Sequence, residues 1–312
     1  MTHGQAIRFD RYGDRDVLHV AEVEIPDPGA GEVLIEVRAA AINPGEAAIR
    51  SGALHEMFPA TFPTGQGSDL AGVVSALGDG VSDLSPGDEV LGYSWTRSSQ
   101  ATHAVVPATQ LVPKPPALSW PVAGSLYVVG CTSWAAVSAV DPRGGETVAV
   151  SAAAGGVGTV VTQLLALRGA RVLGIASPAN AQWLTAHGAI PVAYGPRLRE
   201  DLTAAAPEGI DAFIDLFGPE YVQLAYDLGV APERIETIIA RAKAQELGTQ
   251  NKGSGDASTQ EVLSEMAELV ASGQIEIPIA ATYRLQDVRE AFAVLERRHT
   301  RGKIVLLPGP ES

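Results

Sequence analysis

The chain has 312 residues, 46% of them hydrophobic and 19% charged, which is enough for two globular domains with sizeable cores. A formal net charge of −14 argues against nucleic-acid binding and against anionic membrane surfaces, because both require basic patches. A single cysteine, Cys131, excludes an intramolecular disulfide, and no leader or bilayer-length apolar run is evident. We therefore expect a cytoplasmic protein.

Short alternating strands characterise the N-terminal part of the chain. Val33–Arg38 and Val90–Tyr93 are two of them, and turns rich in proline and glycine at 27–29 and 85–88 separate such strands. This pattern predicts an all-β domain. The stretch VPKPPA, Val112–Ala117, is extended and stiff and predicts the exit toward a second domain.

A glycine-rich turn follows at Thr147–Gly158, TVAVSAAAGGVG. A short apolar strand runs into the glycines, and a helix is predicted at Thr159–Leu167, which is the order that a dinucleotide pyrophosphate site requires. Glycines let backbone amides approach the phosphates, and the positive end of the helix faces the anion. The predicted cofactor-binding residues of this turn are Ala154, Gly155, Gly156, Val157 and Gly158.

Repeated β-α-β units continue beyond the turn. We predict strands at Arg171–Ala176, Ile190–Tyr194 and Asp211–Leu216, with a helix near Ala179–His187. Such repeats predict a doubly wound Rossmann domain.

The end of the second strand indicates which nucleotide is bound. An acid at this point would hold the ribose of NAD, but the residues from Gly174 to Pro178 include none. The absence disfavours NAD and permits a 2′-phosphate, to which Ser177 and Tyr194 would donate hydrogen bonds. Asn180 stands where a lysine would be favourable, and the nearest arginine, Arg197, lies beyond the third strand. We predict NADPH as the cofactor.

Two segments follow the Rossmann pattern. Gly248–Ser258 is polar and glycine-rich, which predicts a mobile loop. A helix is predicted at Thr259–Ala271, and its core positions would be Val262, Met266, Leu269 and Val270.

Several ordered motifs cover nearly the whole chain. They are Ala41–Pro44, Ile49–Gly52, Gly67–Val74, Gly87–Gly92, Thr132–Trp134, Ala154–Gly158 and Gly302–Leu306. On these motifs the chain resembles the medium-chain dehydrogenase/reductase superfamily, and within it the zinc-free quinone oxidoreductase branch related to zeta-crystallin.

The resemblance implies an α/β architecture of two domains. A GroES-like β-barrel catalytic domain would comprise residues 1–118 and be completed by 276–312. A doubly wound Rossmann domain that binds NADP(H) would comprise residues 119–275. Homodimers are common in the family, so we expect one here.

The chain lacks the ligand sets that zinc requires. A catalytic zinc needs three protein ligands and a structural zinc needs clustered cysteines. The six histidines are scattered without ligand spacing, and Cys131 lies in an apolar segment typical of a buried small residue. We predict no metal site.

The resemblance places Asn43 beside nicotinamide and substrate, Thr132 near the carboxamide, and Arg298 near the cofactor. Each residue has an alternative role. Asn43 before Pro44 would make a turn, Thr132 would cap a helix, and Arg298 would be solvated on a helix face.

The chain departs from the family where a tyrosine is usual near the substrate. Ala48 occupies that neighbourhood and Glu46 stands where an aspartate is usual, so no proton donor is identified. Tyr93, Trp95 and Tyr127 are candidates to line the pocket or to lie in the core. The loops Ala53–Thr64 and Ser94–Gln100 are predicted to choose the substrate.

These predictions together favour an NADPH-dependent, metal-free reductase. Its substrate would be a small molecule, either a quinone or an α,β-unsaturated carbonyl compound. In such an enzyme the nicotinamide delivers hydride, and the protein binds, orients and excludes water. Two alternatives stay open: an enoyl reductase that tailors a biosynthetic intermediate, and a non-catalytic cofactor binder in the manner of the lens crystallins.

Overall fold

The computed structural model describes residues 3–309 of the chain. It divides into two compact units: unit 1 is Met1–Val128, Thr259–Ser272 and Ile279–Ser312, and unit 2 is Val129–Ser258 and Gly273–Pro278. These boundaries differ from the predicted ones, since unit 1 extends ten residues further and also takes the segment 259–272. The reason is local packing: the Gln260 side-chain amide donates to the Leu111 carbonyl oxygen at 2.7 Å, which joins that segment to a strand of unit 1.

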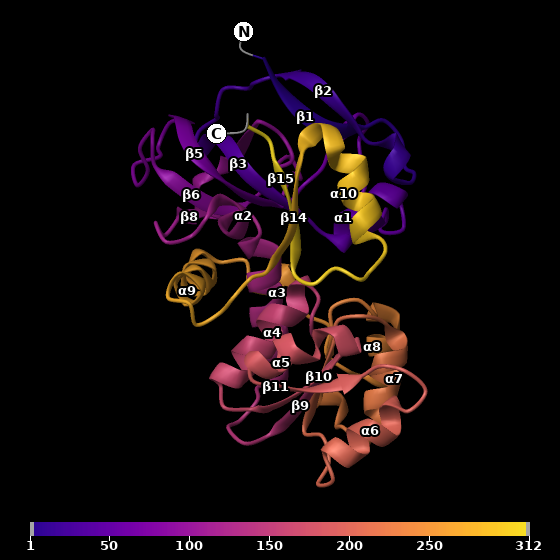
Figure 1. Ribbon diagram of the computed structural model, residues 1–312. Coiled ribbons are helices and arrows are strands. Elements are labelled where there is room, and N and C mark those ends of the chain that lie inside the picture. Colours follow the sequence, from indigo (N-terminus) through magenta and orange to yellow (C-terminus); the bar gives the residue numbers. More distant parts are fainter. Residues whose placement is uncertain (1–2, 310–312) are drawn as a thin grey trace. The chain divides into compact units, whose positions relative to one another are not determined.

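Two sheets form unit 1 (Figure 1). The large sheet contains β14 (Ile279–Arg284), β15 (Lys303–Leu307), β3 (Glu32–Ile42), β5 (Asp69–Leu77), β6 (Glu89–Tyr93) and β8 (Leu111–Pro113) in that order, with β7 (His103–Pro107) paired to β3. The small sheet contains β2 (His19–Glu24), β1 (His3–Phe9) and β4 (Thr64–Gly65). Both predicted strands of this part, at 33–38 and 90–93, lie within β3 and β6.

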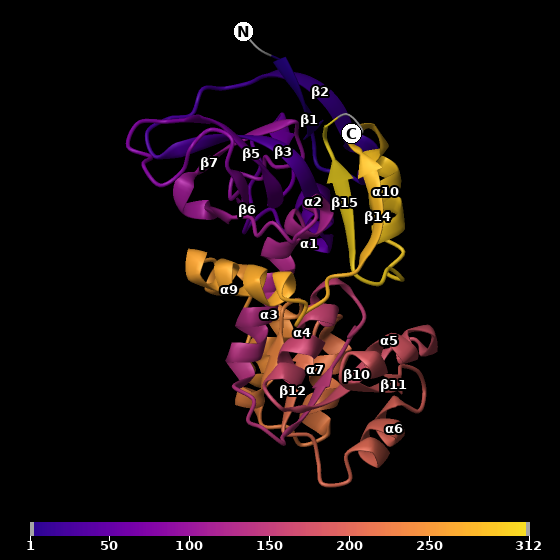
Figure 2. The ribbon, with the colours of Figure 1, turned by 60° about the vertical axis from the view of Figure 1, so that its left-hand side comes forward.

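The C-terminal strand completes the large sheet of unit 1. β15 pairs antiparallel with β3, with Val305 opposite Ala41, and parallel with β14. Figure 2 shows β14 and β15 side by side with helix α10 (Val288–Leu295) against them. The apolar face of α10 packs there on a core that joins both ends of the chain: Ile7, Phe9, Leu18, Ile42, Leu285, Val288, Ala291, Phe292, Ile304 and Leu306.

Three further helices belong to unit 1: α1 (Pro44–Ser51), α2 (Trp120–Ala123) and α9 (Gln260–Ala271). α9 confirms the predicted helix, but its buried face is shifted. Leu263, Met266 and Ala267 are buried, whereas the other three predicted core residues are only half-buried. Only Met266 of the predicted four is therefore fully in the core.

Unit 2 contains a parallel five-stranded sheet with the order β11-β10-β9-β12-β13. The strands are β9 (Thr147–Val150), β10 (Arg171–Ala176), β11 (Ala189–Ala193), β12 (Ala212–Asp215) and β13 (Ile235–Thr237). The chain builds outward from β9 through β10 to β11 and then returns to β12 on the other side. The predicted doubly wound Rossmann topology is thus confirmed.

Helices cover both faces of this sheet (Figure 1). They are α4 (Gly156–Leu167), α5 (Ala181–Ala186), α6 (Leu198–Ala205), α7 (Pro219–Asp227) and α8 (Arg241–Leu247); α3 (Leu126–Val140) begins in unit 1 and continues in unit 2. Leu202 of α6 and Val222 of α7 pack in one core cluster with Leu173 and Phe213 of the strands. The helix after the glycine turn was predicted to begin at Thr159, but it begins three residues earlier, at Gly156.

The polar segment 248–258 was predicted as a mobile loop, but hydrogen bonds fix it to β13. The Gln250 amide donates to the Ile235 carbonyl oxygen at 2.8 Å, and the Lys252 amide donates to the Glu236 carboxylate at 2.7 Å. Glu236 is buried, and desolvation raises its pKa to about 8. The prediction from composition was wrong because a buried side chain of β13 accepts a hydrogen bond from the backbone of this segment.

Candidate active site

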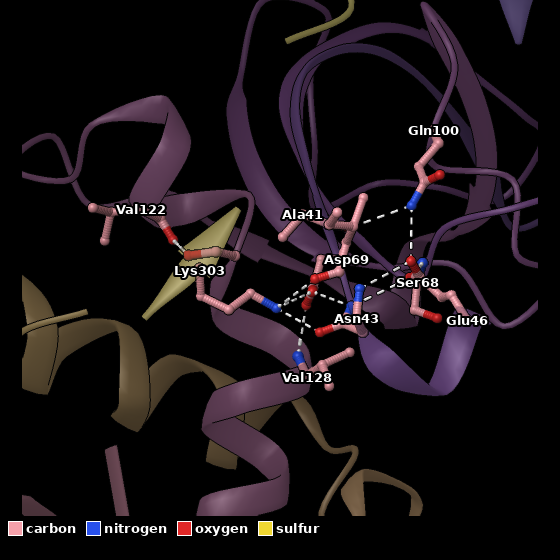
Figure 3. A network of polar contacts seen from close by, with 11 residues as sticks. Ala41, Asn43, Glu46, Ser68, Asp69, Gln100, Val122, Val128 and Lys303 are labelled. Carbon is pink, nitrogen blue, oxygen red and sulfur yellow. Dashed lines mark hydrogen bonds and ion pairs between the residues drawn. The ribbon is translucent and has the colours of Figure 1, made fainter. Parts of the chain in front are cut away.

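A buried polar network surrounds Asn43 in unit 1 (Figure 3). Asn43 follows β3 and is the N-cap residue of α1, whose first position is Pro44. Its backbone amide donates to the Glu46 carboxylate at 3.1 Å, which caps the start of α1. Its side chain is nevertheless directed into the network, as the following contacts show.

Lys303 binds the carbonyl end of the Asn43 side chain. Its ammonium group comes from β15, is almost fully buried, and donates to Asn43 Oδ1. It also contacts Asp69 Oδ2 at 3.3 Å, and Asp69 is fully buried at the start of β5. A buried cation is thereby paired with a buried carboxylate. The pairing offsets the cost of removing both charges from water.

Both amide hydrogens of Asn43 are also engaged. Asn43 Nδ2 donates to Asp69 Oδ2 at 2.9 Å and to Glu46 Oε1 at 3.2 Å. The side-chain N–H groups of Asn43 therefore both have carboxylate acceptors within the network. In this arrangement Asn43 positions the start of α1.

Glu46 is enclosed by hydrogen-bond donors. Besides Asn43, the Ser68 amide donates to it at 3.1 Å and Gln100 Nε2 donates at 2.9 Å. Burial, followed by repulsion from the Asp69 carboxylate, raises the pKa of Glu46 to about 7 even though the Asn43 hydrogen bonds lower it. Glu46 therefore changes charge near neutral pH.

Asp69 also links the network to the start of α3. The Val128 backbone amide donates to Asp69 Oδ1 at 2.6 Å. Desolvation raises the pKa of Asp69, whereas Lys303 opposes that shift most strongly. One ammonium group thus faces two buried carboxyl groups and lowers the pKa of each against the effect of burial.

The glycine turn of unit 2 lies at the carboxyl end of β9. A Cβ atom on Gly158 would lie 2.1 Å from the Ala152 carbonyl oxygen, so only glycine permits this approach of α4 to the turn that follows β9. Gly155 is the N-cap residue of α4, and a Cβ there would lie 3.2 Å from the same oxygen. The first N–H groups of α4 have no intrahelical partner and are suited to a phosphate. Ala154, Gly156 and Val157 complete the predicted cradle, and these residues fit a dinucleotide pyrophosphate.

A buried carboxylate of unit 2 supports the edge of the sheet beside the cradle. Asp215 ends β12 and accepts hydrogen bonds from the hydroxyls of Ser151 and Thr237, each at 2.7 Å. It also accepts from the amides of Phe217 and Gly218. These contacts tie together the carboxyl ends of β9, β12 and β13, where the strand order reverses and where dinucleotides bind in such sheets.

The residues predicted to receive a 2′-phosphate lie at the same edge. Asn180 Nδ2 donates to Ser177 Oγ at 3.0 Å, and the Tyr194 amide donates to the Ala176 carbonyl oxygen at 3.4 Å. The structure thus brings Ser177, Asn180 and Tyr194 together around the ends of β10 and β11. Arg197 is exposed and already lies near two carboxylates, Glu200 and Asp201, at 3.5 Å each.

The positions of Thr132 and Arg298 do not fit the alternative structural roles predicted for them. Thr132 is buried in the middle of α3, so it does not cap a helix. Arg298 is exposed with φ 56°, and α10 ends before it at Leu295, so it does not lie on a helix face. Arg298 belongs to unit 1 with Asn43, whereas Thr132 belongs to unit 2 with the glycine cradle.

Two family models match the chain. The model for the alcohol dehydrogenase GroES-like domain matches residues 29–116, and the model for a zinc-binding dehydrogenase matches residues 187–306. Together with the site, they define a two-domain dehydrogenase or reductase that uses a nicotinamide dinucleotide.

Individual relatives make the assignment more specific. The quinone oxidoreductase of Salmonella typhimurium is 28% identical over 97% of this chain and 99% of its own. The solved quinone oxidoreductase of Coxiella burnetii is 28% identical, with a TM-score of 0.90 over 99% of this chain and 100% of its own. The Escherichia coli quinone oxidoreductase complexed with NADPH is 25% identical, with a TM-score of 0.87 over 97% and 100% of the two chains.

The chain belongs to the medium-chain dehydrogenase/reductase superfamily, an NAD(P)H-dependent family of enzymes. Within it the chain falls in the branch of the quinone oxidoreductases.

The described residues do not fit the zinc that one model's description implies. Within residues 3–309 no three His, Cys, Asp or Glu side chains are grouped as metal ligands. Cys131 is fully buried in α3. In the same part of the chain, no helix combines the length and apolarity needed to cross a bilayer.

The sequence-based reasoning missed Asp69 and Lys303 as parts of the site. Both stand inside quoted motifs, and both are charged residues within otherwise apolar strands. A charged side chain in a buried strand requires a partner, and this signal could have revealed the pair. It could not have shown that the partner strands adjoin across more than two hundred residues.

Proposed function

We propose that this protein is an NADPH-dependent, metal-free reductase of quinones or α,β-unsaturated carbonyl compounds. The observation that carries this proposal is the glycine cradle at the switch point of a doubly wound sheet. The relatives that match nearly the whole chain include several quinone oxidoreductases. The neutral residues Ser177, Asn180 and Tyr194 support NADPH over NADH, because residues 174–180 contain no carboxylate to repel a 2′-phosphate.

The proposed roles of the residues follow from their chemistry. The cradle from Ala154 to Gly158 would hold the pyrophosphate, and nicotinamide, when bound, supplies hydride. Thr132 and Arg298 are proposed to contact the cofactor. Asn43, held by Lys303, Asp69 and Glu46, is proposed to fix the backbone at the start of α1 beside the substrate, with its side chain turned inward.

Titration of intrinsic tryptophan fluorescence with NADPH and NADH tests the cofactor assignment. 9,10-Phenanthrenequinone and a simple enone are then added while nicotinamide absorbance is recorded. Tighter binding of NADPH and its oxidation with either acceptor are expected. Binding without oxidation would favour a narrow biosynthetic substrate or a non-catalytic binder, and Gly156→Asp is the control that should abolish binding by repelling the pyrophosphate.

We further propose a homodimer in the cytoplasm, on the basis of the family and of the single cysteine. Sedimentation equilibrium measures the mass directly. A monomer at micromolar concentration would refute the dimer.

A further inference from the structure

Three aromatic side chains of unit 1 contact one another. Tyr93, the last residue of β6, and Tyr127, in the first turn of α3, stack with ring centroids 4.1 Å apart and an interplanar angle of 16°. Trp95 meets both rings edge-on, at 5.7 Å and 6.4 Å. Edge-on support from a stacked pair holds the indole ring in one orientation.

The three rings differ sharply in exposure. Tyr93 is 5% exposed and Tyr127 is 3% exposed, so both are core residues, which was one of their two predicted roles. Trp95 is 48% exposed. Trp95 therefore offers a large apolar surface to a planar ligand while two core rings hold its edges.

The turn that carries Trp95 is fixed by hydrogen bonds. Its backbone amide donates to Gln110 Oε1 at 3.3 Å, and the preceding Ser94 amide donates to the Ser68 carbonyl oxygen at 2.8 Å. The Ser98 amide closes the turn by donating to Ser94 Oγ at 3.1 Å. The exposed ring of Trp95 is therefore preorganised. A ligand that binds to it costs the protein little conformational entropy.

This aromatic cluster adjoins the Asn43 network through Asp69. Asp69 is the register partner of Tyr93 across β5 and β6. Its carboxylate also accepts from Val128, the residue next to Tyr127, as Figure 3 shows. The two loops predicted to choose the substrate contact each other, since the Arg97 guanidinium lies 5.5 Å over the Phe58 ring.

We propose that Trp95 is a specificity-determining residue whose exposed face receives the planar ring of the substrate. This inference rests on the proposed function and narrows its substrate class to ring quinones in preference to acyclic enones. The electron-rich indole stacks favourably on an electron-poor quinone ring, whereas an acyclic enone offers no ring to stack. The buried tyrosines act through Trp95 and position it.

Steady-state kinetics of Trp95→Ala and Trp95→Phe test the proposal, with NADPH and either 9,10-phenanthrenequinone or 3-penten-2-one as acceptor. We expect Trp95→Ala to raise KM for the quinone about tenfold and Trp95→Phe to restore most of the loss, because a ring is retained. The KM for the enone and the Kd for NADPH should not change. Tyr226→Ala removes another exposed aromatic ring, on α7, and should leave all parameters unchanged.

A binding measurement complements the kinetics. Quenching of tryptophan fluorescence by the quinone, in the presence of NADP⁺ so that no hydride is available, should be strong in the wild type and largely lost in Trp95→Phe. Three other tryptophans remain as an internal reference. Thermal melting of each variant shows that the fold is retained.

The possible failures are distinct. An active wild type whose quinone KM is insensitive to Trp95→Ala, or whose KM values for both acceptors rise equally, would overturn the Trp95 proposal and leave the reductase function standing. A wild type that binds NADPH but reduces neither acceptor would overturn the reductase function and the Trp95 proposal with it.

Discussion

Glu46 is the residue through which pH acts most directly on unit 1. It is almost fully buried, and desolvation followed by repulsion from Asp69 raises its pKa from 4.5 to about 7. In the window between these values the folded protein holds a proton that the unfolded chain has released. The protonated Glu46 side chain therefore makes its full contribution to the free energy of unfolding below pH 4.5. That contribution is lost as pH rises toward 7.

We expect Glu46→Gln to abolish this part of the pH dependence. The free energy of unfolding of the wild type should fall relative to that of the variant by about 2–3 kcal/mol between pH 4.5 and 7.5. Urea unfolding at several pH values measures the difference. Glu265→Gln changes an exposed carboxylate of α9 and is the control, and parallel curves for wild type and Glu46→Gln would contradict the assignment.

Lys303→Met should destabilise the protein strongly, because it leaves the Asp69 carboxylate buried without its cation. The expected loss is about 3–5 kcal/mol. Lys303→Met combined with Asp69→Asn should lose less than the sum of the single variants, and a double-mutant cycle by urea unfolding measures the coupling. Additive effects would mean that the two groups do not interact.

Asn180→Lys should raise the preference for NADPH over NADH about tenfold, because a cation beside Ser177 would pair with the 2′-phosphate. The ratio of the two dissociation constants from fluorescence titration measures it. Ala204→Lys adds the same charge near the C-terminal end of α6, which lies toward the amino ends of the parallel strands. This variant should not change the ratio. An equal response of both variants would indicate only a general effect of charge.

At the scale of elements, the contact between α4 and the turn that follows β9 depends on one glycine. Gly158→Ala would place a Cβ atom 2.1 Å from the Ala152 carbonyl oxygen and 2.8 Å from backbone atoms of Ala153. We expect a loss of stability of about 1–3 kcal/mol, together with weaker NADPH binding, because the helix must shift away from the turn that precedes it.

Gly144→Ala provides the matched control for this prediction. Its nearest contact would be the Arg168 carbonyl oxygen at 3.9 Å, which is ordinary van der Waals distance. Thermal melting and fluorescence titration compare the two substitutions. Equal effects at both positions would show that the close approach at Gly158 does not matter.

At the scale of the whole molecule, unit 1 depends on the C-terminal strand. β15 lies between β14 and β3, and it also supplies Lys303. A chain that ends at residue 300 should lose the near-ultraviolet circular dichroism of the Tyr93 cluster. It should still bind NADP⁺, because it retains both segments of unit 2.

Circular dichroism and equilibrium dialysis measure these two properties of the truncated chain. A chain that lacks only residues 308–312 keeps all of β15 and should behave as the full chain. Loss of NADP⁺ binding in the chain that ends at 300 would show that unit 2 cannot fold without unit 1.

The sequence by itself determined the doubly wound topology, the glycine cradle and the superfamily, because strand-turn-helix order and glycine spacing are local properties of the chain. The start of α4 and the buried face of α9 were less well predicted, since neighbouring elements decide them. Only the tertiary structure decided that Lys303 neutralises Asp69 and that Asn43 is turned inward. It also decided that Trp95 is exposed while its two tyrosine neighbours are buried. These features arise from pairing between distant strands, and hydrophobic periodicity carries no information about which distant residues meet.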